Sequence, residues 1–316
     1  MTQTSQPRHY DVAVIGAGSA GLQAALTLGR MRRDVVVFST DRFRNDPAEH
    51  MQNFLGHDGE SPAELRLAAR KDLERYGTVE LVERAVVAVE GAPDAFVVAV
   101  DGSPDVTARR VLLATGLSDE LPDVPGLADL FGTVVAHCPY CHGHELADRR
   151  VGLLGAGPHV PMLAQLISRL ASEVVVLTNG AEPEPAVLAA IKALRLELHT
   201  GPVLGVEAAG DGLRALLGQD HAVELGGMFV APTWRQAAPF AEQLGLETGE
   251  LGGVLVDIMG ATSRPGVYAA GDLAHHRDLP MPMASVLTAA AAGLVAGAAC
   301  DRDLAMADLA RVVTMT

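Results

Sequence analysis

A glycine-rich turn between a buried strand and a helix constrains this chain more than any other feature of its sequence. Residues 11–15 form an apolar run, Gly16-Ala-Gly18-Ser-Ala-Gly21 follows, and an alanine- and leucine-rich segment then leads to a second apolar run at 35–38. This order predicts the strand, turn, helix and strand of a dinucleotide-binding βαβ unit. Gly16 permits the tight turn, Gly18 lets a pyrophosphate approach the backbone, and Gly21 lets helix and strand pack closely. A purely structural glycine turn is the alternative.

An acidic residue is expected about 20 residues beyond such a turn, at the ribose hydroxyls of the nucleotide. The second apolar run ends in Ser39-Thr40, and Asp41 follows. Asp41 is therefore the candidate for this contact. The alternative is a solvated loop carboxylate.

A second unit of the same kind begins near the middle of the chain. Residues 151–154 lead into Gly155-Ala-Gly157-Pro-His-Val160, a predicted helix to about residue 170 and a strand at 174–177. The repeat predicts two Rossmann-like domains. It is imperfect, because Val160 replaces the third glycine and the cations that a 2′-phosphate favours are missing from residues 178–184. We expect a pocket unsuited to NADPH; a site built from basic residues elsewhere is the alternative.

Two of the three cysteines, Cys138 and Cys141, form a Cys-x-x-Cys motif just after a predicted strand at 133–136. Pro139 suits the first position of a helix, so a short helix is expected to start there. A thiol near a helix N-terminus has a lowered pKa, and two sulfurs at this spacing can close a disulfide reversibly. The motif therefore predicts a redox-active pair.

Other readings of this motif remain open. His142 follows it directly and can take a proton from an attacking thiol or pair with a thiolate. A zinc half-site with ligands from His137, His142 and His144 is one alternative, and inert core cysteines are another. Redox chemistry fits the pattern best. Cys300, in a predicted alanine-rich helix over 284–300, is expected to be a small buried residue.

Two further strand ends add candidates to the first nucleotide site. Ala114-Thr115-Gly116 follows a predicted buried strand, and Gly266-Val-Tyr-Ala-Ala-Gly271-Asp272 precedes the alanine-rich helix. Such a strand end predicts that Asp272 contacts ribityl or phosphate oxygens, with the helix N-terminus near an electron-accepting ring. An ordinary helix-start residue is the alternative.

The composition disfavours several classes of protein. With 24 Lys and Arg against 39 Asp and Glu, the formal charge is −15, which disfavours nucleic-acid binding. The longest nearly apolar stretch, residues 286–300, falls short of the roughly 20 residues that span a bilayer, so no membrane contact is expected. Residues 1–8 lack the apolar segment of a signal peptide, and three cysteines are too few for a disulfide scaffold. A cytoplasmic protein is therefore expected.

In their order, these motifs resemble the low-molecular-weight thioredoxin reductases over nearly the whole chain. Cys138-Pro-Tyr-Cys-His-Gly-His-Glu145 and the stretch from Arg44-Asn45 to Phe54-Leu-Gly-His-Asp-Gly59 are most similar to the related FAD-dependent dithiol oxidases that close the disulfides of holomycin and gliotoxin. His142 stands where reductases carry Asp, and Thr178-Asn-Gly180 stands where they carry His-Arg-Arg. Both departures favour the oxidases.

The resemblance implies an α/β fold of two Rossmann-like domains and a homodimer. Residues 1–117 and 241–316 would form a split FAD-binding domain, and residues 118–240 an inserted pyridine-nucleotide-type domain with the cysteine pair. Cys141 would lie nearest the flavin, Cys138 would exchange with substrate, and His142 would transfer protons. Ser39 stands where relatives often carry Asp. The implied FAD contacts are Gly16, Gly18, Ser19, Ala20, Asp41, Asn45, His50, Val86, Ala114, Thr115, Gly116, Gly271, Asp272, Ala284 and Ser285.

The implied reaction is oxidation of a small-molecule dithiol to an intramolecular disulfide, in the biosynthesis of a dithiolopyrrolone-type antibiotic. O₂ would accept the electrons and become H₂O₂. An NADPH-dependent reductase of thioredoxin or another protein would have the same fold and the opposite electron flow. A ferredoxin-fed reductase would also lack an NADPH site. A flavin redox sensor or dithiol-sequestering protein is the non-enzymatic alternative.

Overall fold

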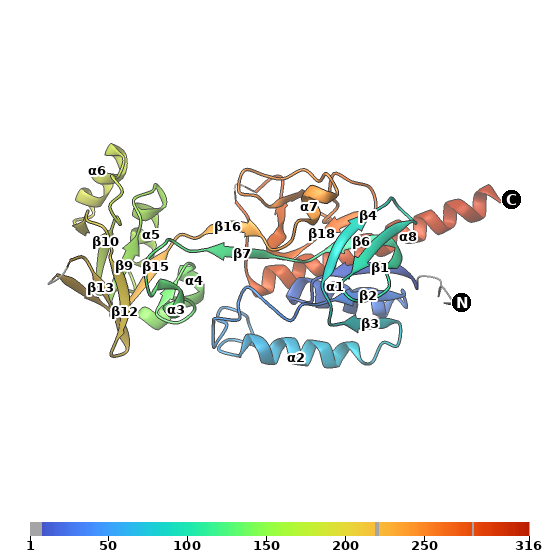
Figure 1. Ribbon diagram of the computed structural model, residues 1–316, viewed down its shortest axis with the longest axis horizontal. Coiled ribbons are helices and arrows are strands. Elements are labelled where there is room, and N and C mark those ends of the chain that lie inside the picture. Colours follow the sequence, from blue (N-terminus) through green and yellow to red (C-terminus); the bar gives the residue numbers. More distant parts are fainter. Residues whose placement is uncertain (1–7, 219–220, 280, 316) are drawn as a thin grey trace. The chain divides into compact units, whose positions relative to one another are not determined.

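The computed structural model describes residues 8–218, 221–279 and 281–315, which form two compact units (Figure 1). The first unit comprises the described residues of Met1–Arg44, Ala63–Ser118 and Trp234–Thr316, and the second comprises those of Asn45–Pro62 and Asp119–Thr233. The sequence expectation places 45–62 in the first domain, whereas the chain's contacts group this segment with the second unit. The domain boundaries at 117 and 240 stay a prediction. Residues 1–7, part of the segment expected to carry no signal peptide, lie outside the described residues.

The first unit is built on a seven-stranded sheet in the order β3-β2-β1-β6-β5-β4, with β18 also paired to β6. The strands β3, β2, β1, β6 and β18 run parallel, while β5 and β4 extend β6 as antiparallel strands. Val12, Ala13 and Val14 of β1 are fully buried, as expected for a strand covered on both faces. The strands are β1 (His9–Ile15), β2 (Val35–Phe38), β3 (Val79–Val82), β4 (Val86–Glu90), β5 (Phe96–Val100), β6 (Val106–Leu113) and β18 (Val267–Ala269), with the separate pair β17 (Val254–Val256) and β19 (Ala274–His276).

Two helices of the first unit, α1 (Ser19–Arg30) and α8 (Val286–Thr314), pack directly against each other. Their backbones approach so closely that a Cβ on Gly293 would overlap the carbonyl oxygen of Ala20. Figure 1 shows α8 continuing past the sheet to the C-terminal end. The other helices are α2 (Pro62–Leu73), α7 (Phe240–Gln243) and the short 3₁₀ turn η2 (Gly271–Leu273). Over the described ranges, none of the helices is both long and apolar enough to cross a bilayer.

The second unit contains a five-stranded parallel sheet in the order β11-β10-β9-β15-β8 and a three-stranded antiparallel sheet, β12-β13-β14. Its strands are β8 (Val135–Ala136), β9 (Arg150–Leu154), β10 (Glu173–Leu177), β11 (Glu197–His199), β12 (Gly205–Ala209), β13 (Gly212–Leu216), β14 (Ala222–Leu225) and β15 (Gly227–Val230). Its helices are α3 (Leu127–Leu130), α4 (Pro139–His142), η1 (His144–Leu146), α5 (His159–Ile167) and α6 (Pro185–Ala193). The chain passes between the units along β7 (Leu117–Glu120) and β16 (Thr233–Gln236), which pair with each other.

Both parallel sheets confirm the two Rossmann-like βαβ units expected from the glycine motifs, but some element bounds differ. Residues 79–90 form two strands, β3 and β4, and residues 205–216 form the hairpin of β12 and β13. The alanine-rich helix begins at Val286 and runs to Thr314, well beyond the expected end at residue 300. Ser285 caps it, because its Oγ accepts a hydrogen bond from the Thr288 amide (3.1 Å).

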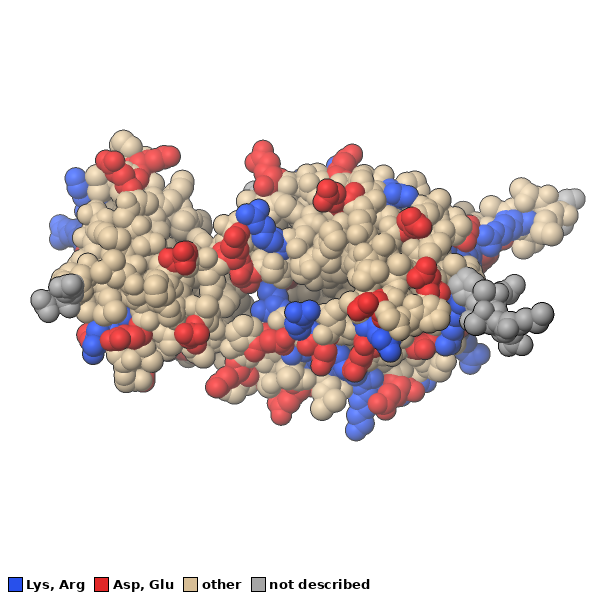
Figure 2. Space-filling view, in the orientation of Figure 1, with Lys and Arg blue, Asp and Glu red and all other residues tan. Residues whose placement is uncertain are grey.

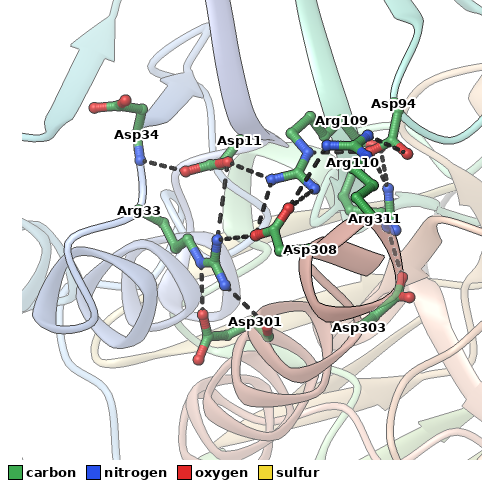
Figure 3. Close-up of polar contacts among 10 residues, drawn as sticks. All are labelled: Asp11, Arg33, Asp34, Asp94, Arg109, Arg110, Asp301, Asp303, Asp308 and Arg311. Atoms are coloured by element: carbon green, nitrogen blue, oxygen red, sulfur yellow. Dashed lines mark hydrogen bonds and ion pairs between the residues drawn. The ribbon is translucent and has the colours of Figure 1, made fainter. Parts of the chain in front are cut away.

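The second half of α8 is held by a cluster of charged side chains, here called the C-terminal ion cluster (Figure 3). The nearly buried Arg109 and Arg110 of β6 form its centre. Arg109 Nη2 lies 2.5 Å from Asp308 Oδ1, and Arg110 Nε lies 2.6 Å from Asp303 Oδ2, so both arginines bind carboxylates of α8. The side chains of the cluster are Asp11, Arg33, Asp94, Arg109, Arg110, Asp301, Asp303, Asp308 and Arg311, and the backbone amide of Asp34 donates to Asp11 (3.1 Å). Elsewhere on the first unit, Figure 2 shows acidic and basic side chains interspersed over the visible face.

Replacing Arg110 is expected to destabilise the first unit. Its side chain is 4% exposed and bonds Asp94 and Asp303, so Arg110→Ala would leave the partly buried Asp303 without its arginine, while Asp94 would keep Arg109 and Arg311. Loss of one member of a buried ion pair costs about 3 kcal/mol or more in unfolding free energy, measurable by urea denaturation. Arg214→Ala, which removes an exposed arginine from Glu207 and Glu224, is the control and should change little. Equal losses in the two variants would contradict this account.

Candidate active site

Three strand ends meet at one edge of the first sheet. The last residues of β1, β6 and β18 align in register, with Ile15 and Ala269 each paired to Leu113. The chain leaving each strand is also fixed, because the Ala114 amide donates to the Ile15 carbonyl (2.8 Å) and the Ala270 amide to the Leu113 carbonyl (3.0 Å). The glycine turn, the Ala-Thr-Gly turn and the Gly-Asp turn therefore converge. Ligands of open α/β sheets bind at this carboxyl edge.

The glycines of the first turn divide into two kinds. Gly16 has φ +109°, and a Cβ there would overlap the Ala114 carbonyl oxygen; a Cβ on Gly21 would overlap the carbonyl oxygen of Gly16. These two are required by the protein's own packing. Gly18 is different, because the described atoms place only Phe43 Cδ1 near its missing Cβ, at 4.0 Å. Glycine at 18 is therefore explained by access from outside, as a bound pyrophosphate needs.

Polar groups at this edge point to a ligand. Ser19 begins α1, and the first amides of any helix lack partners within it, so they can bind a phosphate. Thr115 Oγ1, between β6 and Gly116, is buried and has no hydrogen-bond partner among the described residues. Buried hydroxyls are nearly always paired, so an orphaned one marks a place for an outside group.

Asp272 is held by residues that the motif reading left without a role. Its Oδ2 lies 2.8 Å from Arg44 Nη1, and the Arg44 guanidinium carbon lies 5.5 Å from the ring centroid of Trp234, the only tryptophan of the sequence. The Arg44 and Asp272 side chains are 13% and 21% exposed. A partly buried ion pair of this kind orients the carboxylate. Only the single Trp and the Arg44-Asn45 pair hinted at this contact in the sequence.

The end of β2 is arranged around an arginine from α2. Asp41 Oδ1 accepts from Arg70 Nη2 (2.8 Å), and its amide donates to the buried Ser39 Oγ (3.1 Å). Arg70 also binds Glu83 (2.8 Å). Asp41 is thus a carboxylate already paired with a cation rather than a free one. Its role at a ribose stays a prediction.

The remaining expected contacts are spread over both units. Ala284 and Ser285 lie at the start of α8, which also packs against η2 and so against the Gly-Asp turn. Val86 begins β4 and packs into the core of the antiparallel part of the sheet. Asn45 and His50 lie in the segment that groups with the second unit. For these five residues, contact with a cofactor stays a prediction.

In the second unit, Cys138 and Cys141 are joined in a disulfide with Cα atoms 5.3 Å apart. Cys138 has an extended backbone and caps α4, and Pro139 is the first helical residue, as expected. The amides of Cys141 and His142 both donate to the Cys138 carbonyl (3.2 Å). Tyr140, between the cysteines, is 67% exposed, and both cysteines are half-buried. Since α4 has one turn, its dipole adds little to the reactivity of these sulfurs.

His142 ends α4 immediately after the disulfide. Its Nδ1 is buried and finds no hydrogen-bond partner within the part of the chain that is described. Burial lowers the pKa of His142 below its usual 6.5; the Glu145 charge and a backbone hydrogen bond to Gly132 oppose that shift without cancelling it. The imidazole is therefore neutral near pH 7 and free to accept a proton. A neutral base beside a disulfide suits thiol–disulfide exchange.

Cys300 and the histidines near the disulfide bear on the alternative interpretations of the motif, inert cysteines and a zinc site. Cys300 carries a buried free thiol whose pKa is raised by burial, and this confirms the expected small buried residue. The His137 ring stacks on Phe131 with centroids 5.9 Å apart, and His144 is exposed. The described residues contain no group of three or more His, Cys, Asp or Glu side chains placed to hold a metal ion.

A dinucleotide-binding edge on one Rossmann-like unit and a Cys-x-x-Cys disulfide on the other define a nucleotide-dependent disulfide oxidoreductase. Residues 10–293 match the pyridine nucleotide-disulphide oxidoreductase family, and the chain belongs to it. It is 32% identical to thioredoxin reductase sirT of Leptosphaeria maculans, covering 96% of this chain and 97% of the relative. It is also 32% identical to thioredoxin reductase tcpT of Claviceps purpurea, covering 83% and 86%.

Solved structures give the same assignment. HlmI is 36% identical with a TM-score of 0.88, covering 97% of this chain and 96% of that one. An oxidoreductase from Agrobacterium tumefaciens is 35% identical with a TM-score of 0.85, covering 94% and 99%. These matches confirm the thioredoxin-reductase-like fold expected from the motifs.

Thioredoxin-reductase-like members of this family are FAD-binding flavoproteins, and so is this chain. The residues of the first unit fit the cofactor. Gly18 leaves room for the pyrophosphate at the start of α1, and the unpaired Thr115 Oγ1 and the oriented Asp272 offer polar contacts at the same edge. When bound there, FAD supplies a two-electron acceptor for a dithiol.

Substitutions at two glycines should separate FAD binding from folding. Gly18→Ala meets open space, so the apoprotein should keep its thermal midpoint while FAD affinity falls, because the added methyl occupies the pyrophosphate approach. Gly21→Ala forces the helix from the strand and should cost about 1–3 kcal/mol of stability. Calorimetry of apoprotein and FAD titration check both. Destabilisation of Gly18→Ala with unchanged FAD affinity would contradict the assignment.

Proposed function

We propose that this flavoprotein oxidises a small-molecule dithiol to an intramolecular disulfide. The electrons pass through the Cys138–Cys141 pair to FAD and then to O₂, giving H₂O₂. The substrate class is the reduced form of a disulfide-bridged antibiotic of the dithiolopyrrolone type. In balance, one dithiol and one O₂ give one cyclic disulfide and one H₂O₂.

The disulfide beside a half-buried His142, whose Nδ1 is buried and whose pKa is lowered, is the observation that carries this proposal. The structure holds the cysteines in the oxidised form, which accepts electrons from a dithiol. The neighbouring imidazole can accept the substrate's proton because burial keeps it neutral. The resemblance of the Cys138–Glu145 and 54–59 stretches to disulfide-forming oxidases supports a small-molecule substrate.

The exchange proceeds in two thiolate attacks. A substrate thiolate attacks Cys138 Sγ, forming a mixed disulfide and releasing Cys141 as a thiolate. His142 takes the proton of the second substrate thiol, which attacks the substrate sulfur of the mixed disulfide and releases Cys138. The substrate leaves as a cyclic disulfide with two electrons fewer, and the enzyme holds the reduced pair.

An NADPH-driven disulfide reductase is the competing function, and the names of the relatives sirT and tcpT, both thioredoxin reductases, favour it. It requires the second glycine turn to bind NADPH. Thr178 and Asn179 follow β10 at that site, and their side chains bind the protein itself. Thr178 Oγ1 donates to the Thr200 carbonyl (3.2 Å), and Asn179 Oδ1 accepts from the Val203 amide (2.9 Å). This arrangement supports the oxidase.

A second copy of the chain and a cytoplasmic setting complete the proposal. The outer part of α8 exposes Met306 and Leu309, at 65% and 54%, and Val313, at 64%, which lie on one helix face. We expect a second copy to cover this apolar face in a homodimer. The free Cys300 thiol is compatible with a reducing compartment, in which the enzyme's disulfide would oxidise the substrate dithiol.

Anaerobic absorbance of the yellow protein tests the direction of electron flow. A reduced dithiol should bleach the flavin, NADPH should not, and air should restore the colour with release of H₂O₂. Cys138→Ser and Cys141→Ser should each lose turnover while FAD stays bound, because each removes a sulfur that the exchange needs. Cys300→Ala is the matched control and should keep turnover, since that thiol is buried and unreactive.

Fast bleaching by NADPH would instead establish a reductase. Normal dithiol turnover in either active-site variant would exclude the proposed exchange. A single stoichiometric exchange without further turnover in air would identify a redox sensor or sequestering protein.

The His142 assignment predicts a pH profile. Because the pKa of His142 is lowered, the imidazole stays neutral down to more acidic pH than an ordinary histidine, and turnover should fall only below pH 6.5 as it gains a proton. His142→Asn should slow turnover by about 10²–10⁴-fold and remove this acidic limb. The exposed His144→Asn is the control. An acidic limb that persists in His142→Asn would assign it to another group.

A further inference from the structure

The two glycine turns of this chain have the same backbone plan but different surroundings. The second runs from β9 through Gly155-Ala-Gly157 into α5, so Gly157 corresponds to Gly18 and His159 to Ala20 of the first turn. Over Gly18 the described chain leaves open space beyond Phe43. Over Gly157 the described chain leaves no such open space.

The His159 imidazole lies against both glycines of the second turn. A Cβ built on Gly157 would be 2.9 Å from His159 Nδ1 and 3.0 Å from its Cε1. A Cβ built on Gly155 would be 3.6 Å from Nε2 of the same ring. One side chain thus covers the face of the turn that a dinucleotide pyrophosphate must reach.

The charge of this ring does not favour a phosphate either. Burial lowers the pKa of His159, so the imidazole is neutral near pH 7. Unlike a protonated imidazole, it offers no net charge to an anion. The ring already occupies the space over the turn. Because it is neutral, a phosphate that displaced it would gain no attraction to a positive charge.

We propose that His159 is a specificity-determining residue that closes the second dinucleotide turn against pyridine nucleotides. This inference deepens the proposed function, because an enzyme that takes electrons from a dithiol must not be reduced by NADPH. The exclusion is steric and local, and it adds to the missing cations after β10.

The test compares the FAD-bound protein with two variants in which His159 is replaced. His159→Ala gives the second turn the residue found at the same position of the first, and His159→Phe keeps a ring there without its nitrogens. Binding of NADH and NADPH is measured by equilibrium dialysis; NADH needs no cation for a 2′-phosphate. We expect His159→Ala to bind NADH at least roughly ten-fold more tightly than the wild type, and His159→Phe to stay closed. His221→Ala, another imidazole of the second unit, should match the wild type.

Each other outcome overturns the proposal. Equal NADH affinity in the wild type and His159→Ala would show that the ring does not exclude the nucleotide, and opening by His159→Phe would show that bulk is not the cause. Bound FAD and the circular dichroism spectrum establish that each variant is folded. Dithiol turnover in air, measured on the same samples, tests the proposed function separately. NADH can bind the wild type while dithiol turnover persists, and dithiol turnover can be absent while His159 still excludes NADH.

Discussion

The in-register ends of β1, β6 and β18 are the constraint on which the cofactor site depends. Since Ile15, Leu113 and Ala269 stop at the same level of the sheet, three turns from distant parts of the chain open at one place. Close packing of α1 on α8 preserves this level, because Gly293 lets the α8 backbone meet that of Ala20. The C-terminal ion cluster then holds the second half of α8 to the same sheet through ion pairs with β6.

The redox centre of the second unit depends on much shorter-range structure. The Cys138–Cys141 disulfide and His142 belong to one helical turn, so their sequence spacing nearly determines their geometry. Their chemistry is nevertheless set by burial. Desolvation keeps His142 neutral, and a neutral imidazole beside a disulfide accepts protons where a charged one would not.

The two glycine turns share one sequence motif but differ in whether a nucleotide can reach them. Both turns connect a parallel strand to a helix, and both carry glycine at the position that a pyrophosphate approaches. The first is left open over Gly18, whereas His159 lies over Gly157 in the second. A single side chain two residues beyond the glycine makes the difference. This asymmetry agrees with one flavin site and with a second unit that serves mainly to carry the disulfide.

The sequence by itself determined the two βαβ units, the FAD edge and the cysteine pair, because glycine spacing, apolar runs and Cys-x-x-Cys act through neighbours a few residues apart. It did not reveal the Arg44–Asp272 pair, the pairing of Asp41 with Arg70, or the His159 ring over its turn. The full length of α8 also escaped it. These features join residues far apart in the chain or depend on how a side chain is buried. Only the tertiary structure decides them, because local patterns carry no information on which distant groups become neighbours.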